Sequence, residues 1–503
     1  MSGASRAEGR AARVRVLCAA TIVLAASAIA GMLFVMRAGW APSPGFSSAV
    51  VFWNERVSHA ADWWPRILGM EVLWSAALAV LVTTLLIVPP RAPKHFVRAL
   101  LAGQFLLLGV FAATPMALDA DQYAYVAYAD LVDRGYSPYD PPAKRAVLTP
   151  QLHEAATVWS NGEGGSDARE RVVVRDKYGP ALTLGMAAVL EPFRGASLEA
   201  QARVLRILAS LACIVITLLL WDELRDRPWG PAALAAFAFN PLVVTQTAIG
   251  AHDDLFAVLP ALLAYRLAVR GGYAPAALFL GFSAACKLTF APFALPLLAF
   301  AYGRTRRPAV VLAMIAVLLA VPLLFALPFG WWEALIRPYR DAQAYNASLL
   351  FGYLGSAAQR VTRSAGLAQG VRHWLDPSLI VLCAASIAAL AVRGRRETIL
   401  EAGLLLLLFT AARQQTWYAL NLIPMLLIPR RWALGVFLGC TLASQAIQRK
   451  NFIGGWDAPP FVPFLIVAIV SSAALAVAFT TLGRTIVLPR GGFSERAHGR
   501  ATR

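Results

Sequence analysis

The chain has 503 residues, of which 58% are hydrophobic and only 15% are charged, whereas soluble globular domains are roughly 45–50% apolar. This composition excludes an ordinary soluble domain and indicates a protein that crosses a membrane several times. The formal net charge of +18 does not indicate a nucleic-acid partner, because the lysines and arginines are spread over short loops and both termini.

Long apolar runs are the predicted transmembrane helices. The runs at 17–36, 72–88 and 310–327 each approach the roughly 20 residues that cross a bilayer core as a helix. The first run is expected to be retained, because it ends at Met36 without a small-residue cleavage pattern. Together the runs predict an all-α polytopic protein with about 12–14 transmembrane helices, forming a single membrane domain over 1–503.

The five cysteines lie inside apolar runs, without paired spacing and without a nearby histidine cluster. We therefore expect neither a disulfide framework nor a zinc site. The sequence also contains no Gly-rich phosphate loop of the Walker or dinucleotide type, so no cofactor is expected. No metal ligand is assigned, and the need for a divalent metal stays open.

Basic residues predict on which side of the membrane each loop lies. Arginines over 6–15 place the N-terminus in the cytoplasm, and the basic group at 91–98 marks the return after the second span. The third span, near 100–117, therefore ends outside. The basic tail over 484–503 is assigned to the cytoplasm, so both termini are expected on the cytoplasmic side of the membrane.

A large extracytoplasmic loop is predicted over 118–203, because an odd number of crossings must join this outer segment to the cytoplasmic Arg225. The apolar run Pro180–Leu190 is too short to cross, and we interpret it as a juxtamembrane helix on the outer surface. Apolar residues at helical spacing predict a second amphipathic surface helix over Asp121–Arg134.

Two further outer features follow later in the chain. The segment Gly272–Gly303 is predicted to go out and return as two short helices that meet near Lys287. A lysine there is costly unless it is paired or meets water or phosphate. The polar and aromatic segment 330–376 is predicted to form a second extracytoplasmic loop.

Asp119 and Asp121 stand where the third predicted span ends. One of them is a candidate N-cap for the helix that follows. Two acids at this boundary exceed what one cap needs, and ionisable groups at such depth are functional candidates. Both interpretations stay open.

A second acidic group is expected in a tight outer corner between a span that begins near Ala233 and one that begins near Leu255. This corner contains His252, Asp253 and Asp254. A capping role is available to one aspartate, but it does not account for the other two residues.

Four cations are predicted to lie on the same outer face, where together they would form an anion-binding cluster. Simpler interpretations exist for three of them: a solvated loop lysine at Lys177, and interfacial side chains that reach toward water at Arg203 and Arg206. The fourth is Lys287. A later stretch, "ARQQTWYALNLIP", places Gln415, Trp417 and Tyr418 at another outer turn, where an aromatic belt is the alternative.

At these motifs the chain resembles the GT-C superfamily of integral-membrane glycosyltransferases that use a polyprenyl-phosphate sugar donor, especially its bacterial alpha-mannosyltransferase branch. The matching strings occur in the same order as in that branch, over about 100–429. They are "DQYAY", "GYSPYDPP", "KYGPAL", "NPLVVTQTAIGAHDD", "CKLTFAP" and "WYALNLIP". The chain departs from the branch at Asp253, where asparagine is commoner.

The resemblance implies transfer of a hexose, with mannose as the first choice, from a polyprenyl-phosphate donor to a lipid-linked or cell-envelope glycan acceptor. It also implies that the reaction takes place at the extracytoplasmic face of a bacterial inner membrane. It implies Asp121 as the catalytic base, with Asp119 second. The implied donor-phosphate ligands are Lys177, Arg203, Arg206 and Lys287. The implied sugar- or acceptor-binding residues are Tyr123, Tyr178, His252, Asp253, Asp254, Gln415, Trp417 and Tyr418.

A transporter or flippase of lipid-linked sugars is the alternative function, because it too needs charged and aromatic groups within the membrane. The long loop over 118–203 is not needed for alternating access, and the sequence contains no duplicated halves of the kind common in secondary transporters. These two features favour the enzyme. The sugar, the acceptor and the linkage stay open.

Overall fold

The computed structural model describes residues 25–31, 70–87, 93–114, 121–139, 176, 178–337, 434 and 441. Within these ranges the regular structure is helical and contains no strand, which confirms the predicted all-α class. Several predicted features lie outside the described residues: Asp119, Lys177, Gln415, Trp417, Tyr418, the second outer loop beyond Arg337 and the tail over 484–503.

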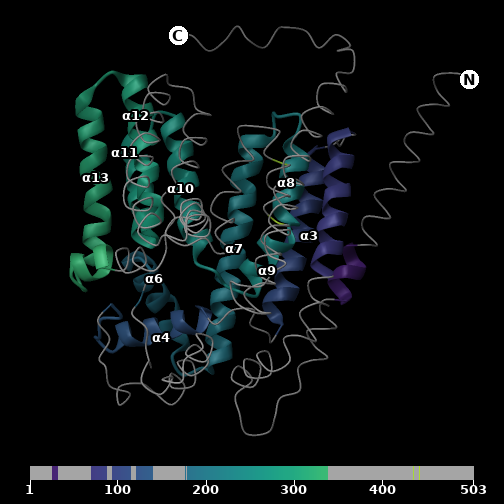
Figure 1. Cartoon of the computed structure of the whole chain (residues 1–503), viewed down its shortest axis with the longest axis horizontal. Coiled ribbons are helices and arrows are strands. Elements are labelled where there is room, and N and C mark those ends of the chain that lie inside the picture. The colour runs from purple at the N-terminus through teal and green to yellow at the C-terminus, as the bar shows by residue number, and fades with distance from the viewer. Residues whose placement is uncertain are drawn as a thin grey trace, which may run out of the picture.

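Four described helices are long and apolar enough to cross a membrane. One is Met70–Ile87, and the others coincide with α3 (Pro93–Ala113), α7 (Leu198–Leu224) and α13 (Pro308–Ala326). They stand roughly side by side with shorter helices between them (Figure 1). This arrangement confirms a polytopic helical membrane protein, while the number of crossings in the whole chain stays a prediction.

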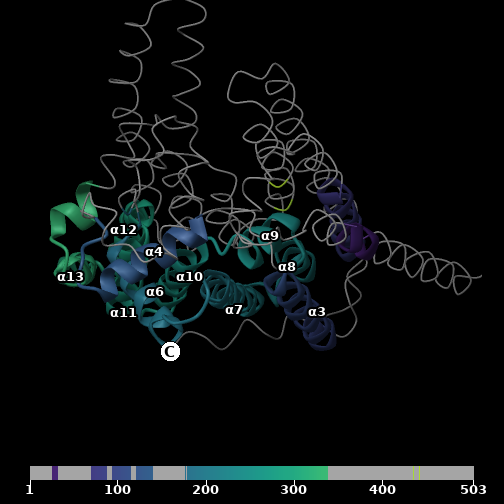
Figure 2. The same cartoon turned by 90° about the horizontal axis from the view of Figure 1, so that it is seen from below.

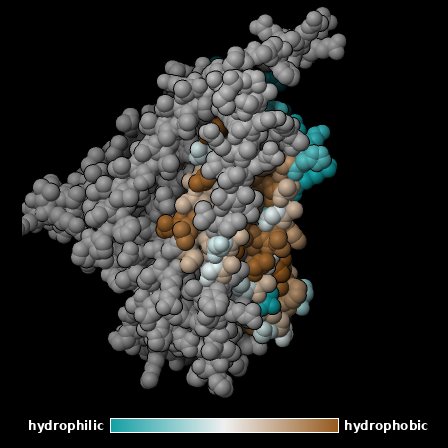
Figure 3. Space-filling view, turned by 90° about the vertical axis from the view of Figure 1, so that its right-hand side faces the viewer, coloured by the Kyte–Doolittle hydropathy of each residue, from teal (hydrophilic) through white to brown (hydrophobic). Residues whose placement is uncertain are grey.

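The surface of the bundle fits this interpretation. Phe105 and Leu106 of α3 are largely exposed, as expected for side chains that face lipid rather than water. Figure 3 shows apolar side chains gathered over the middle of one face, with hydrophilic side chains beyond them. An apolar band between polar ends is what a bilayer requires of a helical protein.

Two short helices cross one end of the bundle, which we call the α4 end. They are α4 (Asp121–Asp133) and α6 (Pro180–Leu190), and both lie where the sequence predicted surface helices. Figures 1 and 2 show them across the ends of the longer helices. Residues 122–129 of α4 are all buried, so this helix is more enclosed than the predicted amphipathic surface helix.

A glycine fixes where α6 begins. The Gly179 backbone N–H donates to the carbonyl oxygen of Cys286 at 2.9 Å, and Pro180 occupies the first helical position, where its missing N–H costs nothing. A Cβ added at Gly179 would lie 2.0 Å from the Ala285 carbonyl oxygen. The contact therefore requires glycine, and it brings the start of α6 against the end of the next hairpin helix.

The predicted hairpin around Lys287 is confirmed. It consists of α11 (Tyr273–Cys286), the short 3-10 helix η3 (Leu288–Phe293) and α12 (Ala294–Thr305), and Lys287 is the residue that ends α11. Helix α11 packs on α10 (Asp254–Val269). The Ser283 hydroxyl donates to the Ala257 carbonyl oxygen at 2.7 Å across this contact.

The span predicted from near Ala233 is not one continuous helix, because the chain forms two short helices there. They are α8 (Gly230–Ala238) and α9 (Pro241–Ala248). Pro241 cannot donate within a helix and its ring clashes with the preceding turn. The Asn240 side chain caps the new start, accepting from the backbone N–H of Leu242 at 2.9 Å.

Charged residues join the helices at the opposite end of the bundle. Asp222, near the end of α7, pairs with Arg266 of α10 and with Arg270, the residue that follows α10. Arg266 also donates to the Leu219 carbonyl oxygen at 3.1 Å. The predicted cytoplasmic markers Arg225, Arg266 and Arg270 therefore gather at one end, and α4 lies at the other.

Candidate active site

Two buried polar groups lie at the α4 end, one on each side of the first turns of α4. The acidic corner consists of His252, Asp253, Asp254 and Lys287. The Arg206 clamp consists of Arg206, Gln122, Thr114 and Glu199. Helix α4 connects the two groups, because the Gln122 side chain, part of the clamp, also donates to the Ile249 carbonyl oxygen at 3.4 Å, just before the acidic corner.

A tight turn builds the acidic corner between α9 and α10. Ala251 adopts a left-handed conformation with a φ of 51°, and the His252 backbone N–H donates back to the Gln246 carbonyl oxygen at 3.1 Å. A Cβ added at Gly250 would lie 2.8 Å from that same carbonyl oxygen. The turn brings His252, Asp253 and Asp254 into the protein interior, where all three are buried.

Lys287 neutralises part of the charge of this corner. Its ammonium Nζ lies 2.6 Å from Asp254 Oδ1 and 3.4 Å from Asp253 Oδ2. The sequence left two possibilities for this lysine, a paired side chain or one that meets water or phosphate, and the structure has it paired. Two carboxylates face one ammonium, so the ionised group of three carries a net negative charge.

The corner is not explained by helix capping. Asp253 occupies the position before α10, but its side chain does not accept a capping hydrogen bond from that helix. Its carboxylate instead accepts from the Tyr125 hydroxyl of α4 at 3.3 Å. Asp253 and Tyr125 are 128 residues apart in the chain, so this contact depends on the tertiary fold.

Among the described residues, His252, Asp253 and Asp254 form the one group of side chains that could hold a metal ion. One ligand atom from each of His252, Asp253 and Asp254 lies within 4.8 Å of the others. Histidine nitrogen with carboxylate oxygens is a donor set used for zinc and several other divalent ions. In this arrangement the Lys287 ammonium already occupies Asp254 Oδ1, so we assign no metal here.

Tyrosines from two segments surround the corner. The rings of Tyr125 and Tyr178 meet edge to face with their centroids 4.9 Å apart. The ring of Tyr128 is tilted against that of Tyr178, with a centroid distance of 6.4 Å. The predicted site residue Tyr178 is therefore beside the corner. Tyr123 is not, because its hydroxyl donates to Glu199 Oε2 at 3.4 Å.

Helical geometry explains why Tyr125, and not the predicted binding residue Tyr123, lies at the acidic corner. Residues two apart on an α-helix point to nearly opposite sides, so one string, "DQYAY", sends its two tyrosines to different polar groups. Tyr125 belongs to the acidic corner and Tyr123 to the clamp. Only the rotation of α4 in the folded protein distinguishes them.

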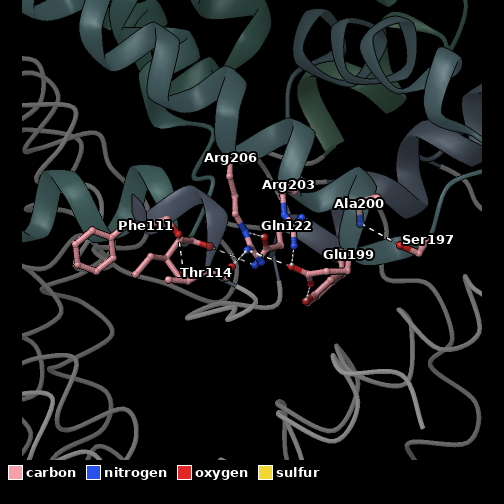
Figure 4. Close-up of polar contacts among 10 residues, drawn as sticks. Phe111, Thr114, Gln122, Ser197, Glu199, Ala200, Arg203 and Arg206 are labelled. Carbon is pink, nitrogen blue, oxygen red and sulfur yellow. Dashed lines mark hydrogen bonds and ion pairs between the residues drawn. The ribbon is translucent and has the colours of Figure 1, made fainter. Parts of the chain in front are cut away.

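Arg206 is the centre of the clamp and is 0% exposed. Its Nε donates to Gln122 Oε1 at 2.8 Å, and its Nη1 donates to the Thr114 carbonyl oxygen at 2.8 Å. The same Nη1 lies 3.3 Å from Glu199 Oε1. Figure 4 shows the guanidinium between these partners. The interpretation of Arg206 as an interfacial side chain that reaches toward water is therefore wrong.

Arg203 lies one helical turn before Arg206 and has a different environment. Its side chain is half exposed, and its Nη2 lies 3.8 Å from Glu199 Oε1. Helix α7 begins at Leu198, where Ser197 accepts from the Ala200 backbone N–H at 3.3 Å. Arg203 and Arg206 are thus within this helix, although the outer loop was predicted to continue to Arg203.

Asp176 is a polar residue of this region that sequence reasoning missed. Its carboxylate accepts from the Tyr178 backbone N–H at 2.8 Å and from the Thr183 hydroxyl at 2.5 Å. The Tyr139 hydroxyl donates to the Tyr178 carbonyl oxygen at 3.0 Å. Burial, together with the charge of Asp176, raises the pKa of Tyr139 well above its usual value. These bonds fix Tyr178 beside the acidic corner.

The predicted cations therefore do not share one set of partners in the described part of the chain. Lys287 belongs to the acidic corner, while Arg203 and Arg206 both lie beside Glu199. Asp121 is the first residue of α4, directly before Gln122 of the clamp. His252, Asp253 and Asp254 lie together in the acidic corner, and Tyr178 lies next to them against the ring of Tyr125.

The fold and this site define a polytopic helical membrane protein with buried acids, tyrosines and cations at one end of its bundle. Residues 17–304 match the family model described as alpha-(1->6)-mannopyranosyltransferase, N-terminal domain. The match spans more than half of the chain, and both polar groups lie within it. The chain belongs to this mannosyltransferase family, which confirms the resemblance seen in the motifs. No curated protein and no solved structure matches the chain.

Proposed function

We propose that the chain transfers mannose from a polyprenyl-phosphate donor to a lipid-linked or cell-envelope glycan acceptor, at the extracytoplasmic face of a bacterial inner membrane. The observation that most directly supports this proposal is the hydrogen bond from Tyr125 to Asp253, which joins the "DQYAY" and "GAHDD" strings at one end of the membrane bundle. A donor with a prenyl tail must stay in the bilayer, so its phosphate and sugar are presented at such an end.

The sidedness of the proposal follows from the basic residues. Arg225, Arg266 and Arg270 gather around Asp222 at the end opposite α4, and short loops rich in arginine remain in the cytoplasm. The α4 end is then extracytoplasmic and both termini are cytoplasmic. Nucleotide-activated sugars are cytoplasmic compounds, so a lipid-linked donor suits a site on the outer side.

The proposed reaction is a displacement at the anomeric carbon of the donor. The acceptor hydroxyl oxygen forms the new bond to that carbon, the bond from the carbon to the phosphate oxygen breaks, and polyprenyl phosphate leaves. The acceptor proton passes to a carboxylate that acts as general base. Asp121 is our first choice for this base and Asp119 our second.

Other residues would bind rather than react. The growing charge on the leaving phosphate needs fixed cations, for which Arg203, Lys177 and Lys287 are proposed. Carboxylates only accept hydrogen bonds, so the buried Asp253 and Asp254 suit the hydroxyl groups of a sugar. Tyr178 and His252 border the same place, and Gln415, Trp417 and Tyr418 remain proposed binding residues.

The decisive experiment uses the purified full-length chain with a panel of polyprenyl-phosphate sugars and glycolipid acceptors. The expected result is a mannosylated acceptor together with free polyprenyl phosphate, from the mannose donor only. The flippase alternative predicts a different outcome in vesicles: a labelled lipid-linked sugar would change leaflet without release of polyprenyl phosphate. That outcome would replace the proposed function.

A further inference from the structure

The Arg206 clamp joins the two ends of the segment that carries the candidate bases. One guanidinium donates to the Thr114 carbonyl oxygen at the end of α3 and to the Gln122 side chain in the first turn of α4. Asp119 and Asp121 lie between these two contacts in the sequence. A single buried side chain therefore sets the relation between the end of α3 and the start of α4.

We propose that Arg206 is a positioning residue for Asp121, and not a ligand of the donor phosphate. This inference rests on the proposed function. Gln122 is the direct neighbour of Asp121 on α4, so the bond from Arg206 Nε to Gln122 Oε1 fixes the rotation of the turn on which Asp121 stands. Asp121 would then be held at the distance from the acceptor that proton transfer requires.

The chemistry of arginine suits this role. A guanidinium is planar and donates in several fixed directions at once, whereas a lysine ammonium is a point charge on a flexible stem. Arg206 uses separate nitrogens for the Gln122 and Thr114 contacts. Lysine at this position would keep the charge beside Glu199 but lose the simultaneous hold on α3 and α4.

Burial argues against direct donor binding by Arg206. The side chain is fully enclosed and ion-paired with Glu199, and its Nη2 has no hydrogen-bond partner among the described residues. If Nη2 nevertheless bound the donor phosphate, loss of the arginine would weaken donor affinity. If Arg206 positions Asp121, its loss lowers the turnover of bound donor instead. The two roles can therefore be distinguished, because loss of a phosphate ligand raises the donor KM and loss of a positioning residue lowers kcat.

The test compares Arg206→Lys with Arg266→Lys in the purified full-length enzyme. Arg266 is a matched control, because it is also a buried, ion-paired arginine of the same bundle but lies at the opposite end. A misplacement of about 1 Å costs roughly 100-fold in rate. We expect Arg206→Lys to lower kcat at least tenfold with donor KM within twofold, and Arg266→Lys to lower Tm but leave kcat unchanged.

Gln122 provides a second test that leaves the arginine intact. Gln122→Met removes the acceptor for Arg206 Nε at nearly constant volume, and Gln122→Glu keeps an acceptor oxygen there. We expect the loss of kcat in Gln122→Met to match that of Arg206→Lys, the double variant to lose no more than either single one, and Gln122→Glu to recover part of the rate. This test also applies if Arg206→Lys does not fold.

Two results would overturn the positioning role. A tenfold rise in donor KM at unchanged kcat would make Arg206 a phosphate ligand. A kcat for Arg206→Lys and Gln122→Met equal to that of the folded Arg266→Lys control would make the clamp purely structural. Absence of transfer by the wild-type chain with every donor would instead contradict the proposed function, which is a separate outcome.

Discussion

Asp121 is the first residue of α4, one position after the N-cap, where a negative charge stabilises the helix N-terminus through the helix dipole and where a carboxylate is also available as a general base. The two roles respond differently to Asp121→Asn, because loss of the charge costs the helix only about 0.3–1 kcal/mol, whereas asparagine cannot accept a proton from an acceptor hydroxyl. A single substitution at Asp121 is therefore the simplest test of the proposed general base.

Asp121→Asn is expected to fold normally and to turn over at no more than about a hundredth of the wild-type rate, because general-base catalysis contributes roughly 100- to 10,000-fold. The measurement is kcat of the purified enzyme with saturating donor, alongside its melting temperature. Asp119→Asn should have the milder effect. Near-normal turnover by Asp121→Asn would leave Asp121 with a structural role at the start of α4 and move the base to Asp119, Asp253 or Asp254.

Lys287 is expected to be needed for stability as well as for binding. Removing one partner of a buried ion pair costs about 3–5 kcal/mol, because the other charge is left unpaired. Lys287→Met should therefore lower the melting temperature in detergent, since Asp253 and Asp254 would then repel each other. Adding Asp254→Asn to it should recover part of the loss. Equal melting temperatures of Lys287→Met and wild type would contradict this pairing.

At the scale of elements, the contact between the start of α6 and the end of α11 connects Tyr178 and Gly179 to the acidic corner. Gly179 lies against the last turn of α11, immediately before Lys287, and Tyr178 packs on Tyr125. A displacement of α6 would thus move both an aromatic wall of the site and the end of the helix that presents the lysine.

Gly179→Ala is expected to lower activity and thermal stability together, because the added Cβ would lie 2.0 Å from the Ala285 carbonyl oxygen. Gly185→Ala is the matched control. It lies within α6, which Gly179 directly precedes, and a Cβ there meets no atom within 4 Å, so this change should be neutral or slightly stabilising. The requirement for glycine at position 179 is contradicted if both variants have the melting temperature and kcat of the wild type.

Sequence patterns predicted several of these elements but not their contacts. Hydropathy with the Gly-Pro pair located α6, and an apolar run interrupted by Lys287 located the α11–α12 hairpin. The Asn240-Pro241 break was missed, although this dipeptide is a known turn signal. The pairing of Tyr125 with Asp253, and the isolation of Arg206 from lipid and water, depend on how α4 rotates in the fold.

At the scale of the whole molecule, the helices alternate in direction so that the polar groups of the site gather at one end and the arginine-rich turns at the other (Figure 1). This separation follows from the parity of crossings that the basic residues predict. The remaining question at this scale is which end faces the cell exterior.

Single cysteines in a cysteine-free background would determine this sidedness. Gly195 lies at the α4 end, where an added Cβ would meet no atom within 4 Å. Asp226 lies at the opposite end, with its side chain 92% exposed. We expect an impermeant thiol reagent to label Gly195→Cys in intact cells, and to label Asp226→Cys only after permeabilisation. The reverse pattern would place the site in the cytoplasm.

The most direct test of the account follows both products of one reaction. Purified enzyme is supplied with polyprenyl-phosphate mannose and a glycolipid acceptor. The account predicts polyprenyl phosphate and mannosylated acceptor in equal amounts, with both lost in Asp121→Asn. Mannosylation that occurs with a nucleotide-activated mannose, and not with the polyprenyl-phosphate donor, would contradict it.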